Sequence, residues 1–182
     1  MGTKEAIEKR RSIRKFKKND IDKEKINAIL EAGRLSPSAK NRQPWYFVVV
    51  NESIKNQIAD IMINHKQKKG QEGDYGYSSS ITFTGEIIKE GTVLILIFTE
   101  EDENYLISDT LSIGACIENM ILMATDLDLG TLWIRDTSHV EKEISSLVGE
   151  TKKLSSALLI GVSDQNPNQR PRKDLKDISK WL

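Results

Sequence analysis

Four side chains near the start of the chain have the chemistry of an anion site. Residues 10–14 read Arg-Arg-Ser-Ile-Arg, which places a hydroxyl among guanidinium groups. Arginine offers a rigid fork of donors that stays charged at physiological pH and suits a phosphate. In an extended segment alternate side chains share a face, so Arg10, Ser12 and Arg14 are expected to point one way and Ile13 inward. The segment therefore predicts a site for a phosphate or another anion.

A second segment, residues 37–45, has the chemistry of a loop that binds a ring edge. It reads Pro-Ser-Ala-Lys-Asn-Arg-Gln-Pro-Trp, so hydroxyl and amide groups stand between two prolines that stiffen the backbone. Such groups suit the edge of a flat, uncharged heteroaromatic ring, although Ser38, Asn41 and Gln43 also fit simple turn roles. Together the two segments indicate a nucleotide-like cofactor. The loop also carries two cations that are expected to face solvent, Lys40 and Arg42.

These two segments resemble the FMN-dependent nitroreductase family. Its members typically open with an Arg-Arg-Ser-Ile/Val-Arg run and continue, after a helix, with Pro-Ser-x-x-Asn-x-Gln-Pro-Trp. The likeness proceeds in the same order through an apolar helix from Gly114 to Gly130, residues 131–134 (Thr-Leu-Trp-Ile) and residues 169–173 (Gln-Arg-Pro-Arg-Lys). It implies a single domain, residues 1–182, with an α+β nitroreductase-like fold. Such a fold has a central mixed or antiparallel sheet flanked by helices, and a C-terminal segment that reaches the dimer partner.

The resemblance also implies which residues hold FMN. The arginine segment would contact the phosphate, the ribityl chain and the pyrimidine side of the ring. The proline-flanked loop would contact the flavin, commonly across the dimer interface, and a basic pair near the C-terminus would close over the phosphate. The implied cofactor-binding residues are Arg10, Arg11, Ser12, Arg14, Pro37, Ser38, Asn41, Gln43, Trp133, Ile134, Arg172 and Lys173. Trp133 could equally be a core residue of a strand instead of a contact to the cofactor.

The resemblance implies chemistry that the flavin carries, with no catalytic side chain. The expected function is an FMN-dependent oxidoreductase with ping-pong kinetics, in which hydride passes from NADH or NADPH through flavin N5 to a small-molecule acceptor such as a nitroaromatic or a quinone. Arg14 is the implied cation near N1 and O2. Cys116 lies in an apolar helix without a CxxC partner, so it is expected to be a buried structural thiol. The spacing of histidine, cysteine and acidic residues predicts no metal site.

Three other functions remain open. A non-catalytic flavin-binding or sensing protein would keep the cofactor contacts but block access to N5. A specialised family member would act as a dehalogenase or fragment its flavin. A nucleic-acid module could use residues 9–18, where seven of ten residues are Lys or Arg. The balance of 27 basic and 27 acidic residues argues against binding to nucleic acid or to an acidic membrane.

Hydrophobic patterning predicts the elements that must position these groups. Helices are expected at Lys4–Lys9, from an N-cap at Asp22 to Pro37, from Ser53 onward, over Ser108–Leu129 with Gly130 as its stop, and from a capping box at Ser138 to Gly149. Buried strands are expected at Trp45–Val50, Thr92–Thr99 and Leu154–Val162. Residues 64–91 read as a loop-rich insertion, at most briefly helical, that would cover the ring and select the acceptor.

Two apolar features predict a homodimer, and three other features predict that it is cytoplasmic. The helix Ser108–Leu129 is apolar nearly all round, and the polar tail from Ser163 ends in Trp181 and Leu182, so both need cover. The charged N-terminus is unlike a signal peptide, and apolar runs such as Val93–Phe98 are too short to span a bilayer. A single cysteine fits a reducing compartment.

Overall fold

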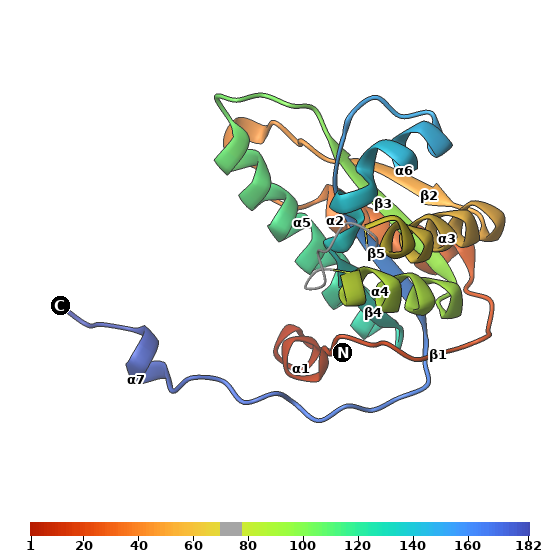
Figure 1. The fold of residues 1–182 in the computed structure, drawn as a ribbon. Coiled ribbons are helices and arrows are strands. Elements are labelled where there is room, and N and C mark those ends of the chain that lie inside the picture. The colour runs from red at the N-terminus through yellow and green to blue at the C-terminus, as the bar shows by residue number, and fades with distance from the viewer. Residues whose placement is uncertain (70–77) are drawn as a thin grey trace.

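The chain forms three layers, with helices on both faces of one antiparallel sheet, in a computed structural model (Figure 1). The structure describes residues 1–69 and 78–182. The sheet has the order β1-β5-β3-β2, and β4 also pairs with β5. All four strand pairings are antiparallel, so the predicted α+β architecture is confirmed. The strands are β1 (Phe16–Lys17), β2 (Tyr46–Val50), β3 (Val93–Thr99), β4 (Gly130–Ile134) and β5 (Lys153–Ser163).

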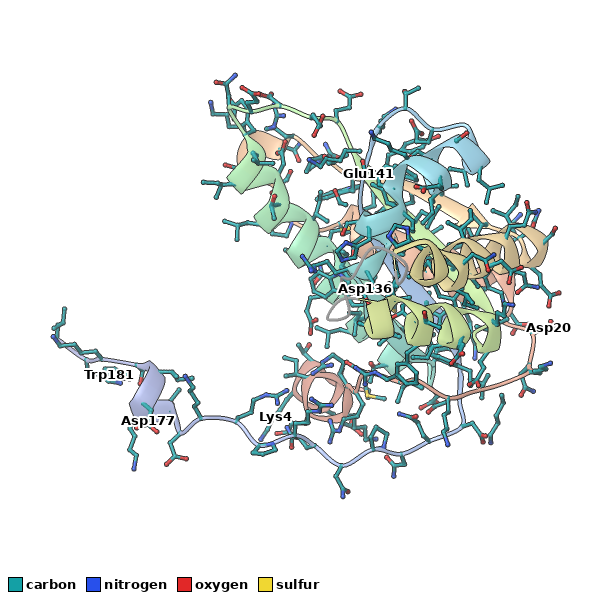
Figure 2. All side chains as sticks on the ribbon, viewed as in Figure 1. Lys4, Asp20, Asp136, Glu141, Asp177 and Trp181 are labelled. Atoms are coloured by element: carbon teal, nitrogen blue, oxygen red, sulfur yellow. The ribbon has the colours of Figure 1, made fainter. Side chains whose placement is uncertain are left out.

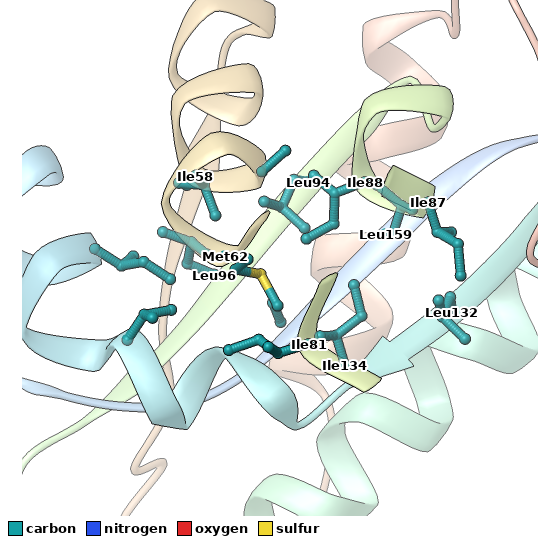
Figure 3. Packing of buried hydrophobic residues seen from close by; sticks show 14 of the residues in the cluster. Ile58, Met62, Ile81, Ile87, Ile88, Leu94, Leu96, Leu132, Ile134 and Leu159 are labelled. Carbon is teal, nitrogen blue, oxygen red and sulfur yellow. The ribbon is translucent and has the colours of Figure 1, made fainter. Parts of the chain in front are cut away.

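The central strand β3 supplies side chains to two hydrophobic cores because successive residues of a strand point to opposite faces. Leu94 and Leu96 pack under three helices on one face, as Figure 3 shows. Ile95 and Ile97 pack against two helices on the other face. A strand buried on both faces reads as a continuous apolar run, which explains the sequence of β3. The covering helices are α3 (Glu52–Lys69), α4 (Ser78–Glu90) and α6 (Glu141–Val148) on the first face, and α2 (Lys23–Arg34) and α5 (Leu106–Asp126) on the second.

Four short helices complete the described fold. Two are 3₁₀ turns that carry loop residues close to the sheet ends, and two lie near the termini. The C-terminal tail leaves the body of the protein and carries the last of them away from it (Figure 1). These helices are α1 (Thr3–Lys9), η1 (Ala39–Asn41), η2 (Asp136–Val140) and α7 (Leu175–Ile178).

The prediction of a loop-rich insertion over residues 64–91 is wrong for most of its length. Helix α3 continues to Lys69, and α4 occupies Ser78–Glu90. Helix α4 is amphipathic, and its apolar residues, including Ile81 and Ile88, are buried in the first core. The serines and threonines between them weaken the helical signal, but tertiary packing overrides propensity. Residues 70–77, which belong to the segment predicted to select the acceptor, lie outside the described residues.

Two predicted helix boundaries also differ from the structure. Helix α5 ends at Asp126, and Gly130 opens strand β4 instead of stopping the helix. A Cβ atom at Gly130 would lie 2.9 Å from Cγ1 of Ile13, so glycine is needed for close packing of the N-terminal segment. Helix α6 begins at Glu141 and Ser138 lies within η2, so the capping box is wrong. Gly149, at φ +69°, ends α6 as predicted.

We expect Gly161→Ala to destabilise the protein by about 1–3 kcal/mol, the usual cost of overpacking a core. A Cβ atom at Gly161 would lie 2.5 Å from Cδ1 of Phe16, which is itself buried. Urea unfolding followed by circular dichroism measures the change. Gly2→Ala is the matched control, since a Cβ there meets no heavy atom within 4 Å. Equal stability of the two variants would contradict the close packing of β1 on β5.

Helix α5 has one covered side and one uncovered flank. Among the described helices it is the one that is long and apolar enough for a membrane span, with a mean hydropathy of 1.4. Core helices of globular domains meet the same criterion, and α5 packs in the second core through Ile117 and Met120. On its other flank Leu106, Ile107 and Leu111 are exposed, with Ile107 77% exposed. This chain alone therefore leaves part of the helix without cover.

Candidate functional site

The arginine segment and the C-terminal tail together line a cavity of about 440 Å³. Strand β4 fixes the segment, because the backbone N–H of Ile13 donates to the carbonyl of Thr131 at 2.8 Å. The side chain of Ile13 is buried, as the predicted alternation requires. Its neighbours line the cavity with residues from α1, α5 and the tail: Ile7, Arg10, Arg11, Ser12, Arg14, Glu118, Gln165, Pro167, Asn168, Gln169, Arg170 and Arg172.

The charge of this cavity suits a phosphate. Five of its lining residues are arginines and one is a carboxylate, Glu118. The carboxylate lies 3.8 Å from Nε of Arg10, which is a weak contact for an ion pair. The Nε atom of Arg11 is buried and has no hydrogen-bond partner among the described residues. The excess of guanidinium charge in the cavity is relieved by a bound anion. The residues present therefore fit the phosphate of a nucleotide-like cofactor.

The proline-flanked loop has a defined and strained backbone. Lys40, Asn41 and Gln43 have φ values of 52°, 54° and 50°, in the left-handed region that side chains other than glycine seldom adopt. The backbone N–H of Gln43 donates to Oγ of Ser38 at 2.9 Å, and that of Asn41 donates to the carbonyl of Ser38 at 3.0 Å. Ser38 therefore organises the turn, while the side chains of Asn41 and Gln43 are exposed.

Arg42 is exposed as predicted, but it also has partners that the sequence did not indicate. Its Nε and Nη2 atoms donate to the two carboxylate oxygens of Asp109 at 3.1 and 3.0 Å, and Nη2 also reaches Asp102 at 3.1 Å. The guanidinium lies 3.9 Å from the ring centre of Tyr105. Hydrogen bonding to Asp109 raises the pKa of Arg42 above its ordinary value. Lys40 is exposed as predicted, although its ammonium donates to the Tyr105 hydroxyl at 2.9 Å.

A second cavity, of about 720 Å³, opens between α5 and the ends of three strands. Its apolar wall includes Gly114 and Ile117, while the adjacent residue Glu118 lines the first cavity. The two cavities thus open along the same helix, with positive charge in one and an apolar wall in the other. The second cavity is also lined by polar residues that the sequence did not indicate, including Asp102, Asp109, Arg135, Ser138, Glu141 and Lys153.

The remaining predicted site residues lie in different surroundings. Trp133 lines the second cavity and is half exposed, and its Nε1 donates to Oγ of Ser156 at 2.6 Å. The side chain of Ile134 is buried in the first core, which leaves its backbone for any contact with a cofactor. Lys173 is exposed and lines neither cavity. Pro37, Ser38, Asn41 and Gln43 also line neither cavity of their own chain.

Asp136 connects helix α4 to the end of strand β4. Its Oδ2 accepts hydrogen bonds from the hydroxyls of Ser80 at 2.8 Å and Thr84 at 2.9 Å. Figure 2 labels Asp136 on the ribbon. Asp136 directly follows Arg135, which lines the second cavity. These bonds hold α4 against the strand end that carries Trp133 and Arg135.

We expect the thiol of Cys116 to resist alkylation in the folded protein. Burial raises its pKa to about 12, so the thiolate is about one part in 10,000 at pH 8. Iodoacetamide labelling followed by mass spectrometry measures the rate, with the same protein in denaturant as the control. Fast labelling of the native protein would show that the thiol is accessible and open a role for it as a nucleophile.

Comparison with known proteins gives consistent matches over nearly the whole chain. The nitroreductase family model matches residues 7–162. The chain is 23% identical over 181 residues to the putative NAD(P)H nitroreductase YfhC of Bacillus subtilis, covering 96% of this chain and 91% of that protein. It is 29% identical over 187 residues to an iodotyrosine deiodinase of Hydra vulgaris, covering 93% of this chain and 68% of that protein.

Two solved structures have the same fold over the full length of the chain. A BluB-like flavoprotein from Clostridium difficile superposes with a TM-score of 0.84 at 26% identity, covering 100% of this chain and 99% of that one. A putative nitroreductase in complex with FMN, from Desulfovibrio desulfuricans, superposes with a TM-score of 0.80 at 24% identity, covering 100% and 97%. The layered architecture described above is therefore the one these proteins share.

Proposed function

The chain belongs to the nitroreductase family, and we propose that it is an FMN-dependent oxidoreductase that takes hydride from NADH or NADPH and delivers it to a small-molecule acceptor. The observation that carries this proposal is the cavity with five arginines and one carboxylate. It suits the phosphate of FMN, and the apolar cavity along the same helix suits a flat ring. The structural neighbour from Desulfovibrio desulfuricans holds FMN, which supports the choice of cofactor.

The residues of the first cavity would bind the phosphate end of the cofactor. Arg10 and Arg172 come from opposite ends of the chain but line the same cavity. Their two guanidinium groups would therefore bind one phosphate without a metal ion. The guanidinium of Arg11 is held by the backbone, because its Nη1 donates to the carbonyls of Glu8 and Arg10 at 2.6 and 2.8 Å, and Ser12 is exposed. Arg14 supplies a permanent positive charge, which favours the anionic form of a reduced ring. When bound, FMN would supply the hydride-transfer chemistry.

The second cavity would hold both the flavin ring and the acceptor. Its walls, including Ile113, Ile117 and Trp133, exclude water from an aromatic ring. The relatives carry the names of nitroreductases and iodotyrosine deiodinases. The preferred acceptors are therefore nitroaromatics and quinones, and reductive dehalogenation of a halogenated phenol is the second candidate.

Two exposed apolar surfaces support a homodimer. One is the flank of α5 with Leu106, Ile107 and Leu111. The other is the tail that leaves the body of the protein (Figure 1) and ends in Trp181 and Leu182, both almost wholly exposed. Water-soluble domains rarely leave such residues uncovered. A partner chain would cover both surfaces and bring its loop residues 38–43 to the cavities of this chain.

Spectroscopy of the purified protein tests the function. We expect visible flavin absorbance, bleaching of that absorbance by NADH or NADPH without oxygen, and parallel double-reciprocal lines when donor and acceptor are varied. Anaerobic recovery of colour with a nitroaromatic or quinone, compared with a halogenated phenol, separates the two candidate activities. Bound flavin that no nicotinamide donor reduces would favour the sensing protein, and a chain that binds no flavin would overturn the proposal.

A further inference from the structure

One cluster of side chains fastens the loop to the start of helix α5. Arg42 from the loop contacts Asp102, Tyr105 and Asp109, and we call these four residues the clamp. Within the clamp, Arg42 and Asp109 share two hydrogen bonds in the paired geometry that guanidinium and carboxylate groups favour. The clamp joins segments separated by 60 and 67 residues along the chain.

The burial of Asp109 distinguishes its pair with Arg42 from ordinary surface ion pairs. The side chain of Asp109 is 7% exposed and that of Arg42 is 29% exposed. The pair between Arg34 and Glu31 is also bidentate, but its side chains are 57% and 51% exposed, and it joins residues of a single helix. An exposed pair of that kind contributes little to structure, whereas loss of one partner from a buried pair leaves a charge unpaired.

The loop needs such an anchor because its backbone is strained. Lys40, Asn41 and Gln43 all have left-handed φ values, and each such residue costs free energy relative to an extended or helical conformation. Arg42 lies among these three residues, so its attachment to α5 fixes the part of the loop where the strain is concentrated. Asn41 and Gln43 are exposed there, and Nε2 of Gln43 donates to the carbonyl of Asn41 at 3.3 Å.

The clamp also reaches the rim of the second cavity. Asp102 and Asp109 both line that cavity, and both are paired with Arg42. The same arginine therefore fixes the loop and neutralises two carboxylates beside the proposed acceptor site. Loss of Arg42 would free the loop and leave Asp109 buried without its partner.

We propose that Arg42 and Asp109 are positioning residues for the flavin ring, because they hold the loop of residues 38–43 in the shape that presents Asn41 and Gln43. The inference rests on the proposed FMN function and deepens it. Neither residue needs to touch the cofactor. Their effect is transmitted through the backbone of the loop, so it concerns the ring and not the phosphate.

The test uses Asp109→Asn and Arg42→Lys in the full-length protein, with Glu31→Gln and Arg34→Lys as matched controls. Asparagine removes the charge of the pair, and lysine keeps the charge but loses the planar fork and the stacking on Tyr105. We expect both clamp variants to bind FMN and riboflavin about tenfold more weakly, to equal extents, since a lost hydrogen bond to a charged group has that order of effect. Controls should bind both flavins like the wild type.

Amide hydrogen exchange without flavin reports on the loop itself. The N–H of Gln43 donates to Ser38, and we expect its exchange to accelerate about tenfold in both clamp variants while amides of β3 keep their rates. Unchanged exchange at Gln43, or a loss of FMN binding with riboflavin binding intact, would overturn the inference. A wild-type protein that binds no flavin at all would contradict the proposed function. The exchange measurement would still test whether Arg42 and Asp109 hold the loop, because it is made without flavin.

Discussion

Replacing Arg10 with alanine is expected to weaken FMN binding by about 1.5–3 kcal/mol, the contribution of a hydrogen bond to a charged group. Arg10 lines the cavity in which guanidinium groups outnumber carboxylates, and its contact with Glu118 is long. The positive charge of Arg10 is therefore only weakly compensated by Glu118, which leaves it for the phosphate to neutralise. Arg172→Ala should act in the same direction, because Arg172 approaches the same cavity from the tail. Fluorescence titration of the flavin-free protein measures both affinities.

Riboflavin separates a phosphate contact from a structural role. It lacks the phosphate, so its affinity should change little in either variant. Arg34→Ala is a suitable control, since Arg34 lies on α2 and pairs with Glu31 outside both cavities. If FMN and riboflavin lose affinity equally in Arg10→Ala, the arginine supports the fold and the phosphate assignment is wrong.

Local pattern predicted helix α2 and the orientation of Ile13 well. The face of α2 that holds Ile26, Ile29 and Gly33 is buried, as helical spacing predicts. Ile13 points inward between arginines that line the cavity. These features depend on the alternation or periodicity of neighbouring residues, which a sequence displays directly.

Features that depend on distant contacts could not be predicted in this way. Arg42 looked like a solvated cation because its partner Asp109 is 67 residues away. Gly130 looked like a helix stop, whereas its true constraint is the side chain of Ile13 on another element. Helix α4 was not predicted because its polar residues weaken the helical pattern, although its apolar residues pack in the first core. In each case a tertiary contact decides the outcome.

The separation of the loop from the first cavity has a physical explanation in a dimer. Arg42 holds the loop at Asp109, near the start of α5, whereas Glu118 lines the anion cavity further along the same helix. At 1.5 Å per residue, nine residues span about 13 Å of helix. The loop and the phosphate cavity of one chain are therefore fixed at a distance by a rigid element. A partner chain related by twofold symmetry could supply the loop instead.

Trp181→Ala is expected to raise the dissociation constant of the proposed homodimer about a thousandfold. Trp181 is 94% exposed in the single chain, and a tryptophan covered by a partner commonly contributes about 2 kcal/mol or more to an interface. A symmetric dimer contains two copies of each contact, so the loss is about 4 kcal/mol, which corresponds to three powers of ten.

Lys176→Ala, on the adjacent short helix α7, is the control, because its ammonium is exposed and pairs with Asp174 on its own chain. Light scattering over a dilution series measures the mass of each variant. A wild-type protein that stays monomeric while fully loaded with flavin would contradict the dimer, and a Trp181→Ala protein as dimeric as Lys176→Ala would place the tail outside the interface.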